Sequence, residues 1–330
     1  MKKEETILIT GGCGFIGHRL ALALKKKGKN IIVYDSLDYE YKFPVYRKFI
    51  GMRLKKLKEA KIPIVQENTT NKRFLTETIA AYRPDRVAHM AAIVSAEICD
   101  KLPDKGYNFN LNATQMLLEV LRQQKQIKQL VFPSSSMVYG HFSSEKVTEE
   151  SPLNPIGIYG ATKLGAEHLI RAYHNIYGLP YTIVRPSALY GPTCINRRVG
   201  QIFIECAIQG IPMFLEGAGE SRLDFTNIDD LIQGIVLIFT RKEALNQTFN
   251  LTYGDSRKIK DLARLIKERY PKAQFEDRPW KKSVPRRGTL DIRKARELLG
   301  FKPKYPLEKG FPLYMDWYDR IGYKHVLGKQ

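Results

Sequence analysis

The segment ILITGGCGFIG, residues 7–17, constrains the fold of this chain most strongly. An apolar run leads into a turn that contains Gly11, Gly14 and Gly17, and an amphipathic segment follows it. Glycine permits a tight turn, so that backbone N–H groups and the N-terminus of a helix can approach a pyrophosphate. The spacing therefore predicts a strand, a phosphate-binding turn and a helix, which together open a dinucleotide-binding sheet.

Strand-like and helix-like segments alternate after this turn. We expect helices at 47–61, 71–82 and 112–124, and strands at 62–68, 84–92 and 127–132. Alternation at this spacing is typical of βαβ units. The predicted fold class is α/β, with a Rossmann-type, doubly wound parallel sheet.

The charge of the chain is strongly basic. It carries 54 Lys and Arg residues against 34 Asp and Glu residues, a formal net charge of +20. Such a balance attracts polyanions, so nucleic acid, an anionic membrane surface and a phosphorylated small substrate are all candidate partners. The basic residues are spread out, and the densest stretch, 47–61, has an apolar helical face. We therefore expect a surface helix packed on a core, and neither a nucleic-acid partner nor membrane insertion.

The apolar runs and the cysteines bear on the compartment. No apolar run approaches the roughly 18 residues that a spanning helix needs, and the first residues lack the core of a signal peptide. The cysteines show neither CxxC nor metal-ligand spacing, which fits reduced thiols and predicts no metal site. They are Cys13, Cys99, Cys194 and Cys206. A cytoplasmic location is expected.

An acidic residue, Asp35, follows the second predicted strand, 18 residues after Gly17. A carboxylate at this place accepts hydrogen bonds from the adenosine ribose hydroxyls of a dinucleotide. It also repels a 2′-phosphate, and no arginine follows it in the sequence DSLD. The expected cofactor is NAD and not NADP.

Two further patterns carry chemistry. Tyr159 and Lys163 stand four residues apart, so on a helix they share a face. A lysine ammonium beside a phenol favours the phenolate and lowers its pKa, which would make Tyr159 a general base near neutral pH. Three serines, residues 134–136, end the apolar run at 127–132, where hydroxyls serve chemistry better than packing.

With these features the chain resembles the extended short-chain dehydrogenase/reductase family. The similarity points to its NAD-dependent nucleotide-sugar epimerase and dehydratase branch, and to UDP-sugar 4-epimerases in particular. It runs from residue 7 to residue 303 and covers nearly the whole chain. Further motifs that carry it are HMAA (89–92), FPSSSMVYG (132–140), YGATKLGAE (159–167), RPSALYGP (185–192) and GESRLDFTNIDD (219–230).

The resemblance implies two domains. A Rossmann domain that binds NAD would comprise 1–185 and about 224–253. A smaller, discontinuous α/β domain that binds the nucleotide sugar would comprise about 186–223 and 254–330. The family resemblance also implies a homodimer.

Site residues follow from the resemblance position by position. Tyr159 matches the catalytic base, Lys163 the residue that holds the nicotinamide ribose, and Ser135 the serine that hydrogen-bonds the reacting hydroxyl. The implied cofactor-binding residues are Gly11, Gly14, Phe15, Ile16, Gly17, Asp35, Asn68, Thr69, Ala91, Ala92, Asn110, Tyr159 and Lys163. The implied substrate-binding residues are Ser135, Ser136, Arg197, Arg222 and Arg287, with Arg198 and Arg286 as further candidates for phosphate binding.

Departures from the family pattern bear on the reaction. Dehydratases of the family carry an Asp–Glu pair after the catalytic Ser or Thr, whereas this chain has Ser136 and Met137. Methionine supplies neither acid nor base, so the pattern favours 4-epimerisation through a transient 4-keto sugar. Ala188 replaces an asparagine that contacts the diphosphate in many relatives, which leaves the nucleotide base open. Glu97 stands where UDP-glucuronate epimerases carry an arginine, which disfavours a carboxylated sugar.

Three alternatives remain at this stage. A 4-ketosugar reductase would use the same serine, tyrosine and lysine with an exchangeable cofactor. A dehydratase would need an acid pair from elsewhere in the chain. A non-catalytic NAD-binding or RNA-binding protein would fit the net charge, although it has no need of the three catalytic side chains.

Overall fold

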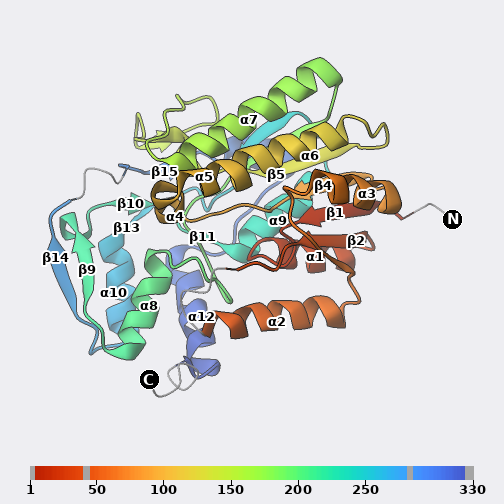
Figure 1. Ribbon diagram of the computed structural model, residues 1–330. Helices are drawn as coiled ribbons and strands as arrows, with labels where there is room; N and C mark the ends of the chain where they lie inside the picture. The colour runs from red at the N-terminus through yellow and green to blue at the C-terminus, as the bar shows by residue number, and fades with distance from the viewer. Residues whose placement is uncertain (1–3, 40–44, 281–284, 324–330) are drawn as a thin grey trace.

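A seven-stranded parallel sheet forms the centre of the computed structural model, which describes residues 4–39, 45–280 and 285–323. The strand order is β12-β7-β5-β4-β1-β2-β3 (Figure 1). The strands are β1 (Thr6–Thr10), β2 (Asn30–Asp35), β3 (Ile64–Gln66), β4 (Arg86–His89), β5 (Gln129–Pro133), β7 (Tyr181–Arg185) and β12 (Gln247–Asn250). The order reverses between β1 and β4, so a crevice opens at the carboxyl ends of these two strands. The predicted α/β class with a Rossmann-type sheet is confirmed.

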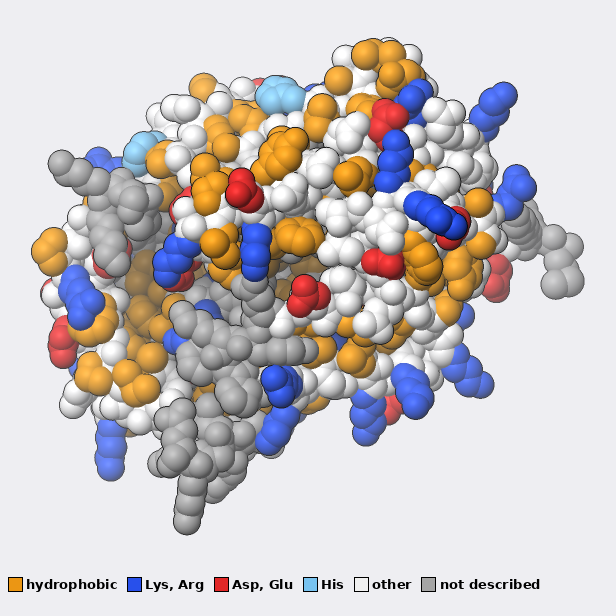
Figure 2. Space-filling view, viewed as in Figure 1, with side chains coloured by type: hydrophobic (Ala, Val, Ile, Leu, Met, Phe, Trp, Pro, Cys, Tyr) orange, Lys and Arg blue, Asp and Glu red, His pale blue; other side chains and the backbone are white. Residues whose placement is uncertain are grey.

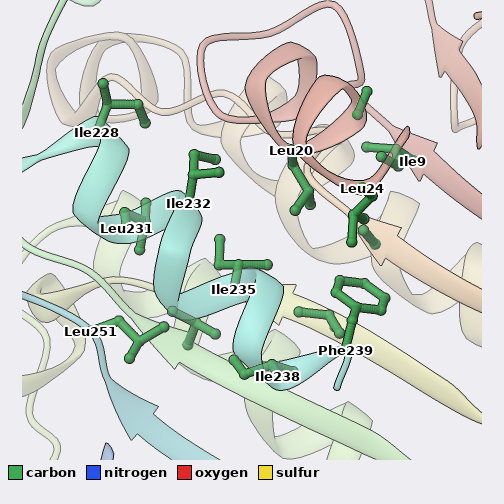
Figure 3. Packing of buried hydrophobic residues seen from close by; sticks show 14 of the residues in the cluster. Ile9, Leu20, Leu24, Ile228, Leu231, Ile232, Ile235, Ile238, Phe239 and Leu251 are labelled. Carbon is green, nitrogen blue, oxygen red and sulfur yellow. The ribbon is translucent and has the colours of Figure 1, made fainter. Parts of the chain in front are cut away.

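Helices cover both faces of this sheet, because both faces are apolar. On β1, Ile7 and Ile9 belong to one buried cluster and Leu8 to the other. Figure 3 shows the first cluster, in which Leu20 and Leu24 face the isoleucines of α9. The helices on this face are α1 (Gly17–Lys26), α2 (Val45–Glu59), α9 (Ile228–Ile238) and α11 (Arg293–Leu299), and those on the other are α3 (Lys72–Tyr82), α6 (Ala113–Leu121) and α7 (Ile158–Tyr177).

A smaller part of the chain has a core of its own, which includes Phe203, Leu262 and Phe311. Its elements are α8 (Val199–Gln209), β9 (Met213–Glu216), β10 (Arg222–Leu223), β13 (Arg257–Lys258), α10 (Ile259–Arg269), β14 (Phe275–Arg278) and α12 (Leu307–Arg320). Two helices cross the expected division: the start of α2 packs in this second core, and α11 packs on the first. The domain boundaries themselves stay a prediction.

Short elements connect these layers. They are α4 (Ala96–Lys101), α5 (Pro103–Gly106), η1 (Tyr107–Asn112), η2 (Ser136–Tyr139), β6 (Lys146–Val147), β8 (Leu189–Tyr190), η3 (Gly217–Gly219), β11 (Thr226–Asn227), η4 (Lys242–Ala244) and β15 (Thr289–Leu290). Among all the helices that the structure describes, none is both long and apolar enough to cross a membrane.

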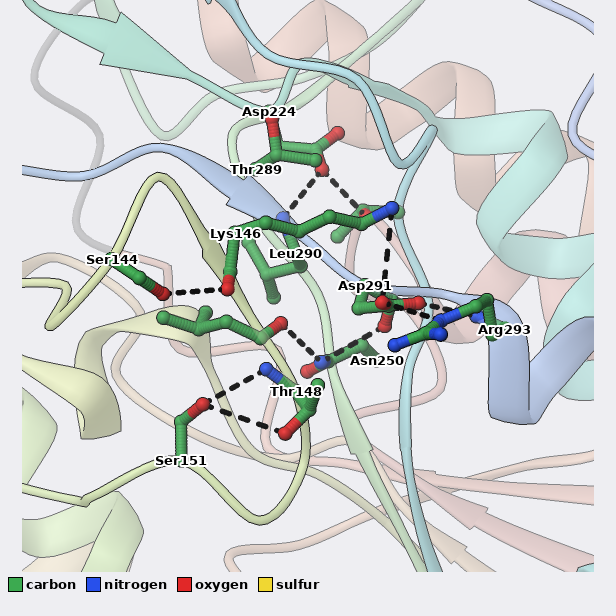
Figure 4. A network of polar contacts seen from close by, with 12 residues as sticks. Ser144, Lys146, Thr148, Ser151, Asp224, Asn250, Thr289, Leu290, Asp291 and Arg293 are labelled. Atoms are coloured by element: carbon green, nitrogen blue, oxygen red, sulfur yellow. Dashed lines mark hydrogen bonds and ion pairs between the residues drawn. The ribbon is translucent and has the colours of Figure 1, made fainter.

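Buried polar contacts join the end of β12 to the end of β15 and to the residue after β10 (Figure 4). The Asn250 side chain donates to the Asp291 carbonyl oxygen at 3.1 Å. The buried Asp224 carboxylate accepts from the Thr252 hydroxyl at 2.9 Å and from the Leu290 N–H at 3.1 Å. Burial raises the pKa of Asp224 to about 6, although these hydrogen bonds oppose the shift. The junction is therefore held by paired polar groups and not by apolar contact alone.

An ion pair inside the larger core ties α7 to β7. Arg185 and Glu167 are both buried, and the guanidinium binds the carboxylate through Nε at 3.0 Å and Nη2 at 2.7 Å. Arg171 reaches the same carboxylate from a more exposed position, at 2.9 Å. Glu167 lies one helical turn after Lys163 on α7. The pair therefore fixes the helix that carries the predicted catalytic residues.

Replacing Arg185 by Met is expected to lower the free energy of unfolding by about 3 kcal/mol, because the buried Glu167 carboxylate then loses its bidentate partner. Chemical denaturation of both proteins measures the difference. The matched control is Arg73→Met, since Arg73 is 90% exposed and pairs with Glu77 only at the surface; it should change stability by less than about 0.5 kcal/mol. An Arg185→Met variant as stable as the control would contradict this account.

Candidate active site

The glycine turn packs directly against the end of β4. Gly11 has φ of +61°, and a Cβ atom there would lie 2.5 Å from the Ala91 nitrogen. At Gly17 a Cβ atom would lie 2.2 Å from the Gly11 carbonyl oxygen. Both positions therefore exclude any side chain, and the turn leaves the N-terminus of α1 open toward the crevice. This cradle fits a dinucleotide pyrophosphate, as the sequence predicts.

Asp35 is the last residue of β2 and lies beside this turn. Its carboxylate accepts hydrogen bonds from the Cys13 and Leu37 N–H groups, both at 2.9 Å, and from the Tyr39 hydroxyl at 3.1 Å. Burial raises the pKa of Asp35, and these hydrogen bonds oppose the shift. The contact with Tyr39 shows that a hydroxyl donor reaches this carboxylate, so the position fits a ribose diol.

The other residues with an implied cofactor role lie after β3 and β4. The Asn68 side-chain oxygen accepts from the Thr70 N–H at 3.0 Å and from its hydroxyl at 2.9 Å, which shapes the loop after β3, and Thr69 beside it is buried. Ala91 and Ala92 follow β4, and Ala91 contacts the glycine turn. The fold therefore brings these residues to the same edge of the sheet as Asp35.

Asn110 lies in η1, a π-helical turn that precedes α6; the sequence placed Asn110 before a helix but did not predict this turn. Its side-chain oxygen accepts from the Ile93 N–H at 2.8 Å, and its nitrogen donates to the Ile93 carbonyl oxygen at 3.0 Å. Asn110 is only 1% exposed. It therefore clamps the loop after β4, and π-helical turns of this kind are frequent at functional sites.

The structure brings Ser135, Tyr159 and Lys163 together at the end of β5. Ser135 follows β5, and its hydroxyl accepts from the Met137 N–H at 3.1 Å. Tyr159 and Lys163 lie on the first turns of α7, and Ser135 lies near enough to the Tyr159 hydroxyl to favour its phenolate form. The Lys163 ammonium donates to the Pro133 carbonyl oxygen at 2.9 Å. Serine, tyrosine and lysine thus share one buried site.

The electrostatics of this site differ from the sequence expectation. Burial raises the pKa of Tyr159, and the charge of Arg198 and the hydrogen bond from Ser135 oppose that shift. Burial also lowers the pKa of Lys163 to about 7. Lys163 is not among the groups that shift the pKa of Tyr159, since its ammonium group is turned to the Pro133 carbonyl oxygen, so the expected effect of Lys163 on Tyr159 stays a prediction. Arg198 supplies the positive charge that favours the phenolate.

A cavity of about 630 Å³ lies in the smaller part of the molecule. Figure 2 shows the surface hollowed near β9, with hydrophobic side chains at the base of the hollow. Aromatic and apolar residues line most of it, namely Tyr190, Met213, Phe214, Leu223, Phe225, Ile259 and Trp280. Two cations, Arg198 and Arg287, line it as well. The sequence signalled the cations, but nothing in it placed Phe214 and Trp280 in one cavity.

The two guanidinium groups of the cavity lie close enough to affect each other. Burial, together with the charge of Arg198, lowers the pKa of Arg287 to about 10. Among the described residues, the buried Nε of Arg287 has no hydrogen-bond partner. Two neighbouring cations, one of them with an unused donor, suit a doubly charged anion such as a diphosphate.

Three other predicted substrate residues lie outside this lining. Arg222 donates to the Ser256 hydroxyl at 3.0 Å and to its carbonyl oxygen at 2.8 Å, and it is exposed. The charge of Arg197 instead acts on Tyr46 and on other groups of the second core. Ser136 is only 1% exposed. Arg198, at the first turn of α8, therefore takes the place in the cavity that the sequence analysis gave to its neighbour Arg197.

Comparison with known proteins agrees with this geometry. The chain is 31% identical to a UDP-glucuronate 4-epimerase of Thermodesulfobacterium geofontis (94% of this chain, 95% of the relative). It is 26% identical to a dTDP-glucose 4,6-dehydratase of Xanthomonas campestris (95% and 93%). A crystal structure of the UDP-glucuronic acid 4-epimerase of Bacillus cereus with UDP-glucuronic acid and NAD superposes with a TM-score of 0.88, at 27% identity over 96% of this chain and 99% of that one.

A family model described as the NAD dependent epimerase/dehydratase family matches residues 7–252. This range contains the glycine turn, Asp35, and the serine, tyrosine and lysine of the buried site. The chain therefore belongs to the NAD dependent epimerase/dehydratase family.

Proposed function

We propose that this protein is an NAD-dependent epimerase that inverts C4 of a UDP-sugar. One observation carries the proposal: the Ser135, Tyr159 and Lys163 site lies near a cavity that presents two adjacent guanidinium groups and aromatic walls. The aromatic walls suit a nucleobase, and the guanidinium groups suit the diphosphate. The sugar would then lie between that diphosphate and Tyr159, since Arg198 lines the cavity and its charge also acts on Tyr159.

Each residue of the proposed site has its own role in the reaction. Tyr159 takes the proton of the sugar 4-hydroxyl and later returns it to the 4-keto sugar, and Arg198 stabilises the phenolate. Ser135 donates a hydrogen bond to the developing carbonyl oxygen. Lys163 would bind a hydroxyl of the nicotinamide ribose of NAD, while Asp35 would bind the other ribose. NAD, when bound, supplies the acceptor that takes and returns the hydride.

Epimerisation is favoured over dehydration because Ser136 and Met137 follow Ser135. Ser136 is buried and Met137 has no ionisable group, so this turn supplies no acid–base pair for removing water. Glu97 bears less on the sugar than its sequence position suggests. It pairs with Lys101 at 2.8 Å on the surface and is not among the described residues of the cavity. Both neutral and carboxylated sugars therefore remain substrates to be tested.

A homodimer and a cytoplasmic location, expected from the sequence, are further parts of the proposal. Large hydrophobic side chains are exposed on and beside α4 to α7, among them Leu102, Tyr107 and Ile158. Figure 2 shows hydrophobic side chains on the face where Figure 1 places α5 and α7. A second copy of the chain is the proposed partner for this surface.

Replacing Tyr159 by Phe is expected to lower kcat at least a hundredfold, because only the ionisable oxygen is lost. The variant should still contain NAD and bind UDP, which titration of the purified protein measures. Tyr177→Phe is the matched control on the same helix, since Tyr177 is 49% exposed and far along the chain from the site. Near wild-type turnover by Tyr159→Phe would remove Tyr159 from the mechanism.

Asp35→Asn is expected to weaken NAD binding about tenfold and to bring the affinities for NAD and NADP closer together. The charged acceptor for the ribose hydroxyls is lost, and so is the repulsion of a 2′-phosphate. Competition titrations with NADH and NADPH measure both effects. Asp38→Asn serves as the control, because Asp38 lies in the same loop and is exposed. Equal affinities of the wild-type protein for the two cofactors would disprove the role of Asp35.

Offered UDP-glucose, UDP-N-acetylglucosamine and UDP-glucuronate, the protein is expected to convert at least one into a C4 epimer of unchanged mass. Deuterium at C4 should remain in the product, because the hydride returns within one closed site. NMR and mass spectrometry follow both features. Loss of water would show that another residue replaces the missing acid–base pair and that the protein is a dehydratase. Washout of the label would indicate an exchangeable cofactor and the reductase alternative.

A further inference from the structure

A buried arginine on α2 lies between the glycine turn and a loop of the substrate cavity. Arg53 is only 1% exposed, although it belongs to the most basic helix of the chain. Its Nη1 donates to the Cys13 carbonyl oxygen at 3.4 Å, and its Nη2 donates to the Thr193 carbonyl oxygen. Cys13 belongs to the glycine turn, and Thr193 precedes Cys194, which lines the cavity. One guanidinium thus joins the two predicted binding sites.

The loop that Arg53 holds has unusual backbone geometry. Thr193 and Arg197 have φ values of +67° and +44°, which is the left-handed region. A β-branched residue such as Thr193 adopts this region only where its surroundings hold it there. The same loop delivers Arg198, the cation of the cavity that acts on Tyr159. The hydrogen bond from Arg53 to the Thr193 carbonyl oxygen is therefore a contact that holds the strained segment in place.

The chemistry of Arg53 suits this bridging position. Its guanidinium is planar and carries donors that point in different directions, so it can bind two carbonyl oxygens at once. It also lies 6.0 Å from the centre of the Phe15 ring, which belongs to the same turn. Within the described residues, its Nε has no hydrogen-bond partner. The bonds that Arg53 makes thus go to the two segments that it bridges and come from two separate nitrogens, whereas a lysine side chain has only one nitrogen to offer both.

We propose that Arg53 is a positioning residue that couples the cofactor turn to the substrate cavity. The identity of the two ligands, NAD and a UDP-sugar, rests on the proposed function. When NAD orders the glycine turn, the Cys13 carbonyl oxygen anchors Arg53, and Arg53 in turn holds the loop that presents Arg198. Binding of NAD and of UDP is therefore positively coupled, and each ligand raises the affinity for the other by the same factor.

The test measures the affinity for NADH by titration, with and without saturating UDP. In the wild-type protein UDP should raise the affinity for NADH at least about fivefold, within the usual range of coupling between sites. In Arg53→Met this ratio should fall below about twofold, because the link between the segments is lost. In Arg53→Lys it should be intermediate. Lys55→Met is the matched control, since Lys55 lies on the same helix and is 78% exposed, and it should keep the wild-type ratio.

The ratio of the NADH affinities with and without UDP distinguishes coupling between the two sites from a purely structural role of Arg53. An arginine that only stabilised the fold would lower the unfolding temperature when replaced and leave the ratio unchanged, and that result would overturn the proposal. If Arg53→Met does not fold, the same ratio of NADH affinities is measured in Arg53→Lys. A ratio in Arg53→Lys equal to that of the wild-type protein also overturns the proposal. Equal NADH affinities of the wild-type protein with and without UDP overturn the coupling alone. Failure of the wild-type protein to bind UDP overturns the proposed function together with the coupling.

Discussion

A parallel sheet must be covered on both faces, and the rest of this structure depends on that constraint. Alternate residues of β1 lie in two separate cores, one on each face of the sheet. The helices that connect the strands must therefore pack on both faces. Because the connections are crossovers, all seven strands point the same way. Their carboxyl ends then meet at one edge, and the glycine turn, Asp35, Ala91 and Ser135 gather there. The site is thus a consequence of sheet topology before any side chain is considered.

Buried charge is the second organising feature of the molecule. Arg185 and Glu167 satisfy each other inside the core, whereas the Lys163 ammonium and the Arg53 guanidinium bind backbone carbonyl oxygens. Burial disfavours the charged form of a group, as the lowered pKa of Lys163 shows. Such groups persist where their contacts hold an element in place. Here they hold α7 and the loop before α8, the two segments that carry residues of the proposed catalytic and substrate sites.

Sequence reasoning succeeded where a residue's role depends on its immediate neighbours. The strand, turn and helix around Gly11 are local, and so is the four-residue spacing of Tyr159 and Lys163. Asp35 could be placed because it ends the strand after the turn. The apolar pattern of 47–61 predicted a helix with one face on a core, and Arg53 lies buried on that helix. The pattern did not reveal the carbonyl oxygens that Arg53 would meet.

By itself the sequence determined the fold class and singled out the serine, tyrosine and lysine that we propose as catalytic, because local spacing and burial periodicity control these features. Only the tertiary structure decided that Arg198 and not Arg197 lines the cavity. The two residues are neighbours just before α8, and the side chains of adjacent residues point in different directions. Tertiary structure likewise decided the pKa values of Tyr159 and Lys163. Those values depend on desolvation and on charges such as Arg198, which stand far away in the chain and meet the site only after folding.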